Sequence, residues 1–149
     1  MNFSANAPSW YATLAKPSFA PPPEIFGIAW EILYPIIFIT FGIVFWLAAK
    51  KKVPRNVALP FAANLIFNFA FSPIAFGLQN NLLASLDIIL VLATLIWAMV
   101  AIWKYSKILA TVQIPYFLWV SFATILQILI TVLNFGELFP NHPVAVPKI

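Results

Sequence analysis

The sequence predicts an all-α membrane protein, a polytopic bundle of four transmembrane helices with an ordered N-terminal loop rich in proline and aromatic residues. Of its 149 residues, 63% are hydrophobic and only 8% are charged, whereas about a quarter of the residues in an ordinary soluble domain are charged. Aromatic residues make up 17% of the chain, and tryptophan and tyrosine favour membrane interfaces. A soluble four-helix bundle is disfavoured, because it needs polar outer faces that these apolar stretches lack.

The N-terminal segment, residues 1–24, is predicted to be a loop packed on the mouth of the bundle. Prolines remove backbone donors and disfavour helix in the residues before them, and here they are Pro8, Pro17, Pro21, Pro22 and Pro23. The same segment carries Trp10, Tyr11 and Phe19, an aromatic density that disordered tails rarely have. It has no basic region followed by a short apolar core, so we expect no cleavable signal peptide.

The bundle is predicted to span residues 25–134, and residues 135–149 a C-terminal tail. A transmembrane helix needs about 20 mainly apolar residues. Stretches of this kind run over 25–49, 57–78, 82–103 and 108–134. Their short connections make consecutive helices antiparallel neighbours. Pro73 is expected to kink the second helix or to open its hydrogen-bond ladder, and Pro115 is expected to break the fourth helix.

Positive charge is concentrated in the first and third connections. These hold Lys50, Lys51, Lys52, Arg55, Lys104 and Lys107, while the second connection, residues 79–81, is uncharged. The positive-inside rule then predicts that both termini face outside. A nucleic-acid partner is disfavoured, because the basic groups lie beside long apolar runs. The chain has no cysteine, so it has neither disulfides nor a thiolate metal site.

Polar residues inside membrane helices are candidates for function. They are Glu31, Asn64, Asn68, Asp87, Ser121, Gln127 and Asn134. Helical spacing places Asn64 and Asn68 on one face, Trp119, Ala123 and Gln127 on another, and Phe26, Trp30 and Tyr34 in a third stripe. Together these faces predict a pocket for a flat apolar ligand with a polar edge. The alternative for the two asparagines is a purely structural role as hydrogen bonds between helices.

Other polar and aromatic residues have simpler explanations. Asp87 is expected either to be hydrated or to cap a neighbouring loop, and Glu31 to reach the outer interface. Trp46 and Trp103 are expected to be interfacial belt residues. His142 is a lone histidine in a proline-rich stretch, and a metal site needs several convergent donors. The sequence shows no catalytic triad, no glycine-rich phosphate loop and no cluster of metal ligands.

Three motifs together resemble the TspO/translocator family, the tryptophan-rich sensory proteins and peripheral benzodiazepine receptors. The first reads Trp10-Tyr11-x-x-Leu14-x-Lys16-Pro17-x3-Pro21-Pro22-x3-Phe26-x3-Trp30-x3-Tyr34. The second reads Asn64-x3-Asn68-x4-Pro73-x2-Phe76-Gly77, and the third reads Pro115-Tyr116-x2-Trp119-x3-Ala123-x2-Leu126, closing with Leu133-Asn134. The chain departs from the family in having Phe71 and Gln127, where Trp and Asn are common, and in lacking the family's first transmembrane helix before Trp10.

The resemblance implies a membrane receptor or carrier that binds porphyrin-like tetrapyrroles, or sterol-like or drug-like apolar ligands, and that needs no cofactor. It implies ligand contacts from Trp10, Tyr11, Trp30, Tyr34, Asn64, Asn68, Trp119 and Ala123, with Asp87 as a loop-closing partner. The alternatives are a proton-coupled transporter using Glu31 and a light-dependent porphyrin-degrading enzyme. The absent helix predicts a homodimer or lipid covering the exposed side. The expected location is a prokaryotic cell membrane.

Overall fold

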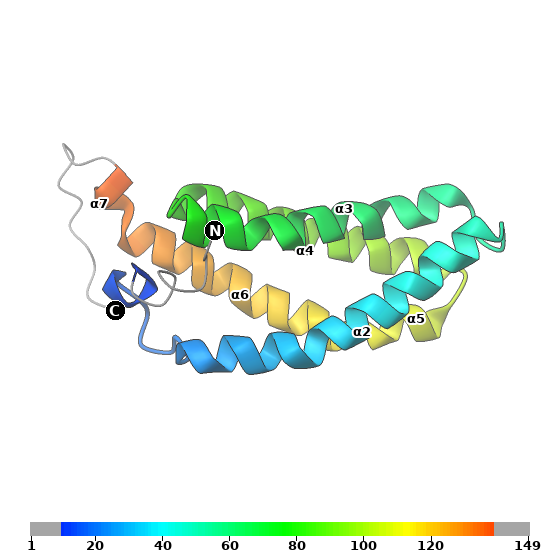
Figure 1. The fold of residues 1–149 in the computed structure, drawn as a ribbon, viewed down its shortest axis with the longest axis horizontal. Coiled ribbons are helices and arrows are strands. Elements are labelled where there is room, and N and C mark those ends of the chain that lie inside the picture. Colours follow the sequence, from blue (N-terminus) through cyan, green and yellow to red (C-terminus); the bar gives the residue numbers. More distant parts are fainter. Residues whose placement is uncertain (1–9, 139–149) are drawn as a thin grey trace.

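The computed structural model describes residues 10–138 and is an elongated bundle of antiparallel helices (Figure 1). The helices that cross it are α2 (Pro23–Ala49), α3 (Arg55–Ser72) continued by the π-helix η1 (Pro73–Gly77), α4 (Asn81–Trp103), and α5 (Lys107–Val112) followed by α6 (Ile114–Leu133). Among the described residues, four helical segments are long and apolar enough to cross a membrane. The predicted all-α bundle with four transmembrane segments is therefore confirmed.

Two proline-directed breaks shape the second and fourth segments. At Pro73 the α-helical ladder gives way to η1, where the Leu78 amide donates to the Pro73 carbonyl over 2.9 Å. The fourth segment is interrupted at Gln113, and Pro115 occupies the first turn of the helix that restarts there, where a missing N–H costs no hydrogen bond. Both breaks lie where the sequence predicts them.

The N-terminal segment is more helical than predicted. Residues 10–13 form a helical turn and α2 begins at Pro23, so the prediction that residues 1–24 form a loop is wrong at both places. No proline lies between positions 10 and 16 to prevent the turn. Asn134 pins this segment to α6, because its Oδ1 accepts from the Ala15 amide at 3.0 Å and its Nδ2 donates to the Ala15 carbonyl at 2.9 Å.

The C-terminal segment also continues further than expected. A short helix, α7 (Phe135–Leu138), follows α6 where the sequence predicts the start of a tail. The first proline of this segment is Pro140, so the backbone before it is free to keep a helical turn. His142 lies outside the described residues.

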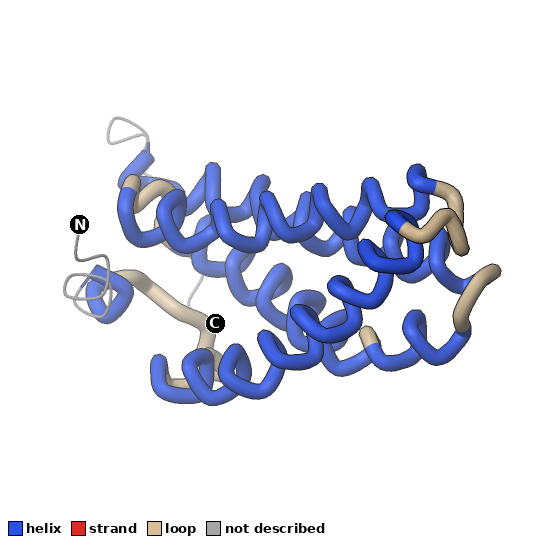
Figure 2. The backbone as a smooth tube through the Cα atoms, turned by 45° about the vertical axis from the view of Figure 1, so that its right-hand side comes forward, coloured by secondary structure: helices blue, strands red, loops and turns tan. Residues whose placement is uncertain are grey.

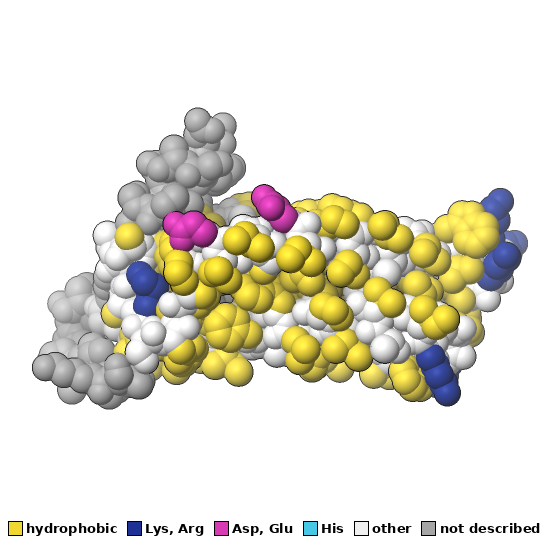
Figure 3. Space-filling model, turned by 90° about the horizontal axis from the view of Figure 1, so that it is seen from below, with side chains coloured by type: hydrophobic (Ala, Val, Ile, Leu, Met, Phe, Trp, Pro, Cys, Tyr) yellow, Lys and Arg dark blue, Asp and Glu magenta, His cyan; other side chains and the backbone are white. Residues whose placement is uncertain are grey.

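The bundle has two chemically different ends. The α2/α3 and α4/α5 connections lie together at one end, and the η1/α4 connection lies at the other (Figures 1 and 2). Most of the Lys and Arg side chains in Figure 3 lie at the first end, and the carboxylates lie toward the second, where a basic side chain is also visible. Between them the outer surface is apolar, with Ile39, Ile66 and Ile108 well exposed, as expected of side chains that face lipid.

Candidate functional site

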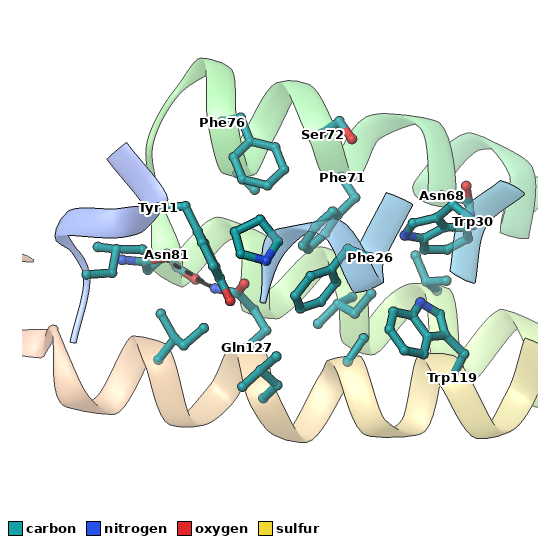
Figure 4. A pocket seen from close by; sticks show the side chains of 18 of the residues that line it. Tyr11, Phe26, Trp30, Asn68, Phe71, Ser72, Phe76, Asn81, Trp119 and Gln127 are labelled. Atoms are coloured by element: carbon teal, nitrogen blue, oxygen red, sulfur yellow. Dashed lines mark hydrogen bonds between the residues drawn. The ribbon is translucent and has the colours of Figure 1, made fainter. Parts of the chain in front are cut away.

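The bundle contains a partly open cavity of about 410 Å³ in the half that lies away from the basic connections. Its walls come from the turn at residues 10–13 and from α2, α3 with η1, α4 and α6, so every transmembrane segment contributes (Figure 4). Most of the lining is aromatic or aliphatic, and a few amide and hydroxyl side chains are spaced around it. A cavity of this size and polarity has the properties of a small-molecule site.

The structure brings most of the predicted binding residues to this cavity. Those that line it are Trp10, Tyr11, Trp30, Tyr34, Asn68, Trp119 and Ala123. Gln127 lines it as well, near Asn81, whose side-chain oxygen accepts from the Gln127 amide at 3.4 Å (Figure 4). The exception is Asn64, which lies behind the wall: it is fully buried, and its Nδ2 donates to the Val91 carbonyl at 2.9 Å.

Aromatic rings form the flat surfaces of the cavity. Trp30 and Tyr34 are stacked, with ring centroids 5.1 Å apart and planes 29° from parallel. Trp119 meets Phe26 edge-on at 5.6 Å. In Figure 4 the Trp30 and Trp119 rings lie on facing helices at the same end of the cavity. Rings fixed by their neighbours in this way offer a preformed surface for stacking a planar ligand.

A directed hydrogen-bond chain supports the floor of the cavity. The Tyr34 hydroxyl donates to Asn68 Oδ1 at 3.4 Å, Asn68 Nδ2 donates to the Tyr116 hydroxyl at 2.7 Å, and that hydroxyl donates to Asn64 Oδ1 at 2.9 Å. Asn64 completes the chain through Val91 and thus joins α2, α3, α6 and α4. Because Tyr116 is fully buried, the chain fixes the orientation of the Asn68 amide in the cavity wall.

Two polar groups of the lining lack a partner among the described residues. The Tyr11 hydroxyl and the Trp119 indole N–H are both buried and make no hydrogen bond there. Burial raises the pKa of the Tyr11 hydroxyl above its ordinary value, so the phenol stays neutral and able to donate. Buried donors without partners cost free energy. A ligand that carries hydrogen-bond acceptors at its edge would satisfy them.

The two carboxylates singled out from the sequence lie apart from the cavity lining. Asp87 is only 5% exposed, so the expectation that it is hydrated is wrong. The sequence position of Asp87 indicates how far along α4 it lies, but it does not indicate whether the side chain faces outward or toward the other helices. No hydrogen bond ties it to the described part of the N-terminal loop, and its loop-closing role stays a prediction. Glu31 is exposed on the outer face of α2, as expected for a residue near the interface.

Sequence reasoning missed several contributors to the site. Tyr116 was not expected at the centre of a network, although it precedes Trp119 by three positions and so shares its helix face. Phe71 and Phe76 line the cavity from either side of the Pro73 break. The change of helix type turns residues of η1 away from the register that α-helical spacing predicts.

The fold and the cavity define a polytopic helical membrane protein built around an aromatic-walled chamber of small-molecule size. Residues 1–133 match the TspO/MBR family. The chain belongs to this family, as the resemblance of its motifs indicated, and it is an integral, multi-pass membrane protein.

Relatives from three domains of life support this membership. The uncharacterized membrane protein YtaB of Bacillus subtilis is 37% identical over 125 residues, covering 84% of this chain and 80% of that protein. The tryptophan-rich protein TspO of Archaeoglobus fulgidus is 38% identical over 128 residues, covering 85% and 80%. The human translocator protein is 30% identical over 122 residues, covering 79% and 70%.

Proposed function

We propose that the chain is a membrane receptor or carrier that binds porphyrin-like tetrapyrroles, or sterol-like apolar ligands, in the aromatic cavity. The observation that carries this proposal is the pairing of flat aromatic walls with unpartnered donors, the Tyr11 hydroxyl and the Trp119 indole N–H. A planar apolar ring would stack on the walls, and acceptors at its edge would take the two donors. The names of the relatives, translocator and sensory protein, agree with such a role.

The direct test is an absorbance titration of the detergent-purified protein against a small panel of porphyrins. We expect saturable binding together with quenching of tryptophan fluorescence. Trp119→Leu keeps an apolar side chain but removes the stacking surface, whose contribution beyond buried area is about 0.5–1.5 kcal/mol, so affinity should fall roughly two- to twelve-fold.

The matched control is Trp46→Leu, which makes the same change at the basic end of α2, where the tryptophan does not line the cavity. Its affinity should equal that of the unmodified protein. Equal losses in both variants would mean that tryptophans serve folding or membrane anchoring, and the proposal would fail. Chemical breakdown of the bound porphyrin under light would instead indicate a porphyrin-degrading enzyme. Flux of the ligand down a gradient in proteoliposomes would indicate a transporter. The outer-face position of Glu31 gives no support to a transporter that uses it.

We also propose a homodimer. Gly42 lies exposed on α2, with no neighbour within 4 Å of the position a Cβ would take. Exposed Ile39 lies three positions before it on the same helix face. Small residues allow close approach of helices in lipid, so α2 of a second copy is a suitable partner. Cross-linking of the protein in bilayers should capture dimers, and Gly42→Leu should reduce them; a monomer in both cases argues against the dimer.

A further inference from the structure

We propose that the α2/α3 and α4/α5 connections form a binding surface for anionic phospholipid headgroups, in which Trp46 and Trp103 each hold a lysine at headgroup depth. This surface lies at the opposite end of the bundle from the aromatic cavity, and the inference does not depend on what the cavity binds. A phospholipid headgroup and a free phosphate ion both present anionic phosphate oxygens. The proposal commits to the lipid as their source.

The first argument is uncompensated charge. The acidic residues whose side chains the structure describes are Glu24, Glu31 and Asp87, and all three lie in the half of the bundle away from these connections. The basic side chains here are Lys50, Lys51, Lys52, Arg55, Lys104 and Lys107. None of them makes a side-chain hydrogen bond or ion pair within residues 10–138. Within residues 10–138 these cations therefore have no acidic partner, and the headgroup layer beside transmembrane helices is an adjacent anionic surface.

The second argument is the placement of two tryptophans. Trp46 near the end of α2 and Trp103 at the end of α4 are both half-exposed on the lipid side. The Nζ of Lys52 lies 4.8 Å from the Trp46 ring centroid, and the Nζ of Lys107 lies 5.6 Å from that of Trp103. Tryptophan settles at the headgroup level, and a cation on its face is held there. No side-chain hydrogen bond within residues 10–138 uses the N–H donors of either lysine, so donors that do not face the ring can reach phosphate oxygens.

The third argument is a rigid backbone beneath the charges. Lys51 has a φ of 58°, the left-handed conformation that normally falls to glycine at a helix end. The Lys52 amide donates to the Leu47 carbonyl at 2.9 Å and closes the turn, and Val53 is buried in the core. The lysines therefore project from a fixed connection and not from a mobile tail, which lowers the entropy lost on binding.

The fourth argument separates a lipid from a soluble anion. Directly beside the basic connections the outer surface is apolar, with Ile108 76% exposed and Val100 64% exposed. A free phosphate would leave these side chains uncovered. A phospholipid satisfies both parts of the surface, since its headgroup meets the lysines while its acyl chains cover the isoleucine and valine.

The experiment counts lipids on the full chain by native mass spectrometry and measures thermal shifts with phosphatidylglycerol, phosphatidylcholine and inorganic phosphate. We expect phosphatidylglycerol to bind about ten-fold or more tighter than phosphatidylcholine, with the preference weakening as salt rises. At constant ionic strength, inorganic phosphate should neither compete nor stabilise. Equal binding of the two lipids, or competition by inorganic phosphate, would overturn the proposal.

Variants locate the surface. Replacing Lys50, Lys51 and Lys52 with glutamine should cost about five-fold in phosphatidylglycerol affinity per lysine, and arginine at the same positions should restore it. Trp103→Leu should weaken binding, whereas Trp97→Leu should not, since Trp97 is equally exposed on α4 but carries no lysine on its ring. Failure of arginine to restore binding, or equal losses at Trp97 and Trp103, would also overturn the proposal. If the glutamine variant does not fold, the proposal is still tested by two measurements. These are the comparison of lipids on the unmodified chain and the comparison of Trp97→Leu with Trp103→Leu.

Discussion

Removing one buried hydroxyl, in Tyr116→Phe, tests whether the hydrogen-bond chain under the cavity stabilises the bundle. The substitution leaves ring packing nearly unchanged but removes the acceptor for Asn68 Nδ2 at 2.7 Å and the donor to Asn64 Oδ1 at 2.9 Å. Hydrogen bonds between membrane helices average about 0.6 kcal/mol each, and a stranded buried group costs about 1–3 kcal/mol. Asn64 keeps its bond to Val91, so we expect a total loss of about 1–3 kcal/mol.

The loss can be measured as the free energy of unfolding in mixed detergent micelles, followed by circular dichroism. The control is Tyr105→Phe, the same chemical change at a half-exposed residue of the basic end, where less than about 0.5 kcal/mol is expected. A double-mutant cycle of Tyr116→Phe with Asn64→Leu should show coupling of about 0.5 kcal/mol or more, since each change removes the same bond. Equal losses for the two tyrosines, or strict additivity in the cycle, would refute the idea that the chain acts as a unit.

Two further outcomes follow from the ends of the bundle. Cysteines placed at Asn80 and Ser106 should label from opposite sides of the membrane, because the basic connections lie together at one end; labelling of both from one side would contradict the topology. Asn134→Leu removes both hydrogen bonds to Ala15, so hydrogen exchange in residues 10–20 should rise, by about five-fold or more if one kcal/mol of local stability is lost. Ser121→Ala is the matched control, since the Ser121 hydroxyl bonds only within its own helix, and equal exchange in both variants would mean that Asn134 does not hold the segment.

The membrane segments were predictable because apolar length determines them, whereas a proline alone does not fix a break: Pro35 and Pro60 lie inside continuous helices. The lipid requires about 20 apolar residues per crossing, and the missing amide hydrogen contributes to the breaks at Pro73 and Pro115. The aromatic lining was predictable for the same reason, since spacings of three and four residues select a helix face. Trp30 and Trp119 both line the cavity as that spacing indicates.

The parts that sequence reasoning missed depend on how helices pack against one another. Asn64 and Asn68 share a helix face but lie one turn apart, so Asn64 meets α4 while Asn68 reaches the cavity. Helical spacing predicts which side chains share a face of one helix. It does not predict which neighbouring helix packs against that face. The same limit hid the role of Tyr116, whose partners are 48 and 52 positions away in the chain.

The bond pair between Ala15 and Asn134 joins positions that are 119 residues apart, and this has a consequence for biosynthesis. At about 5–20 residues per second, a ribosome needs roughly 6–24 s to translate that interval. Throughout this time the N-terminal segment has been made but its anchor has not. The nascent chain therefore inserts its helices before the N-terminal segment is bonded to Asn134. Translation that stops before Asn134 leaves this segment, which lines the cavity, without those two hydrogen bonds.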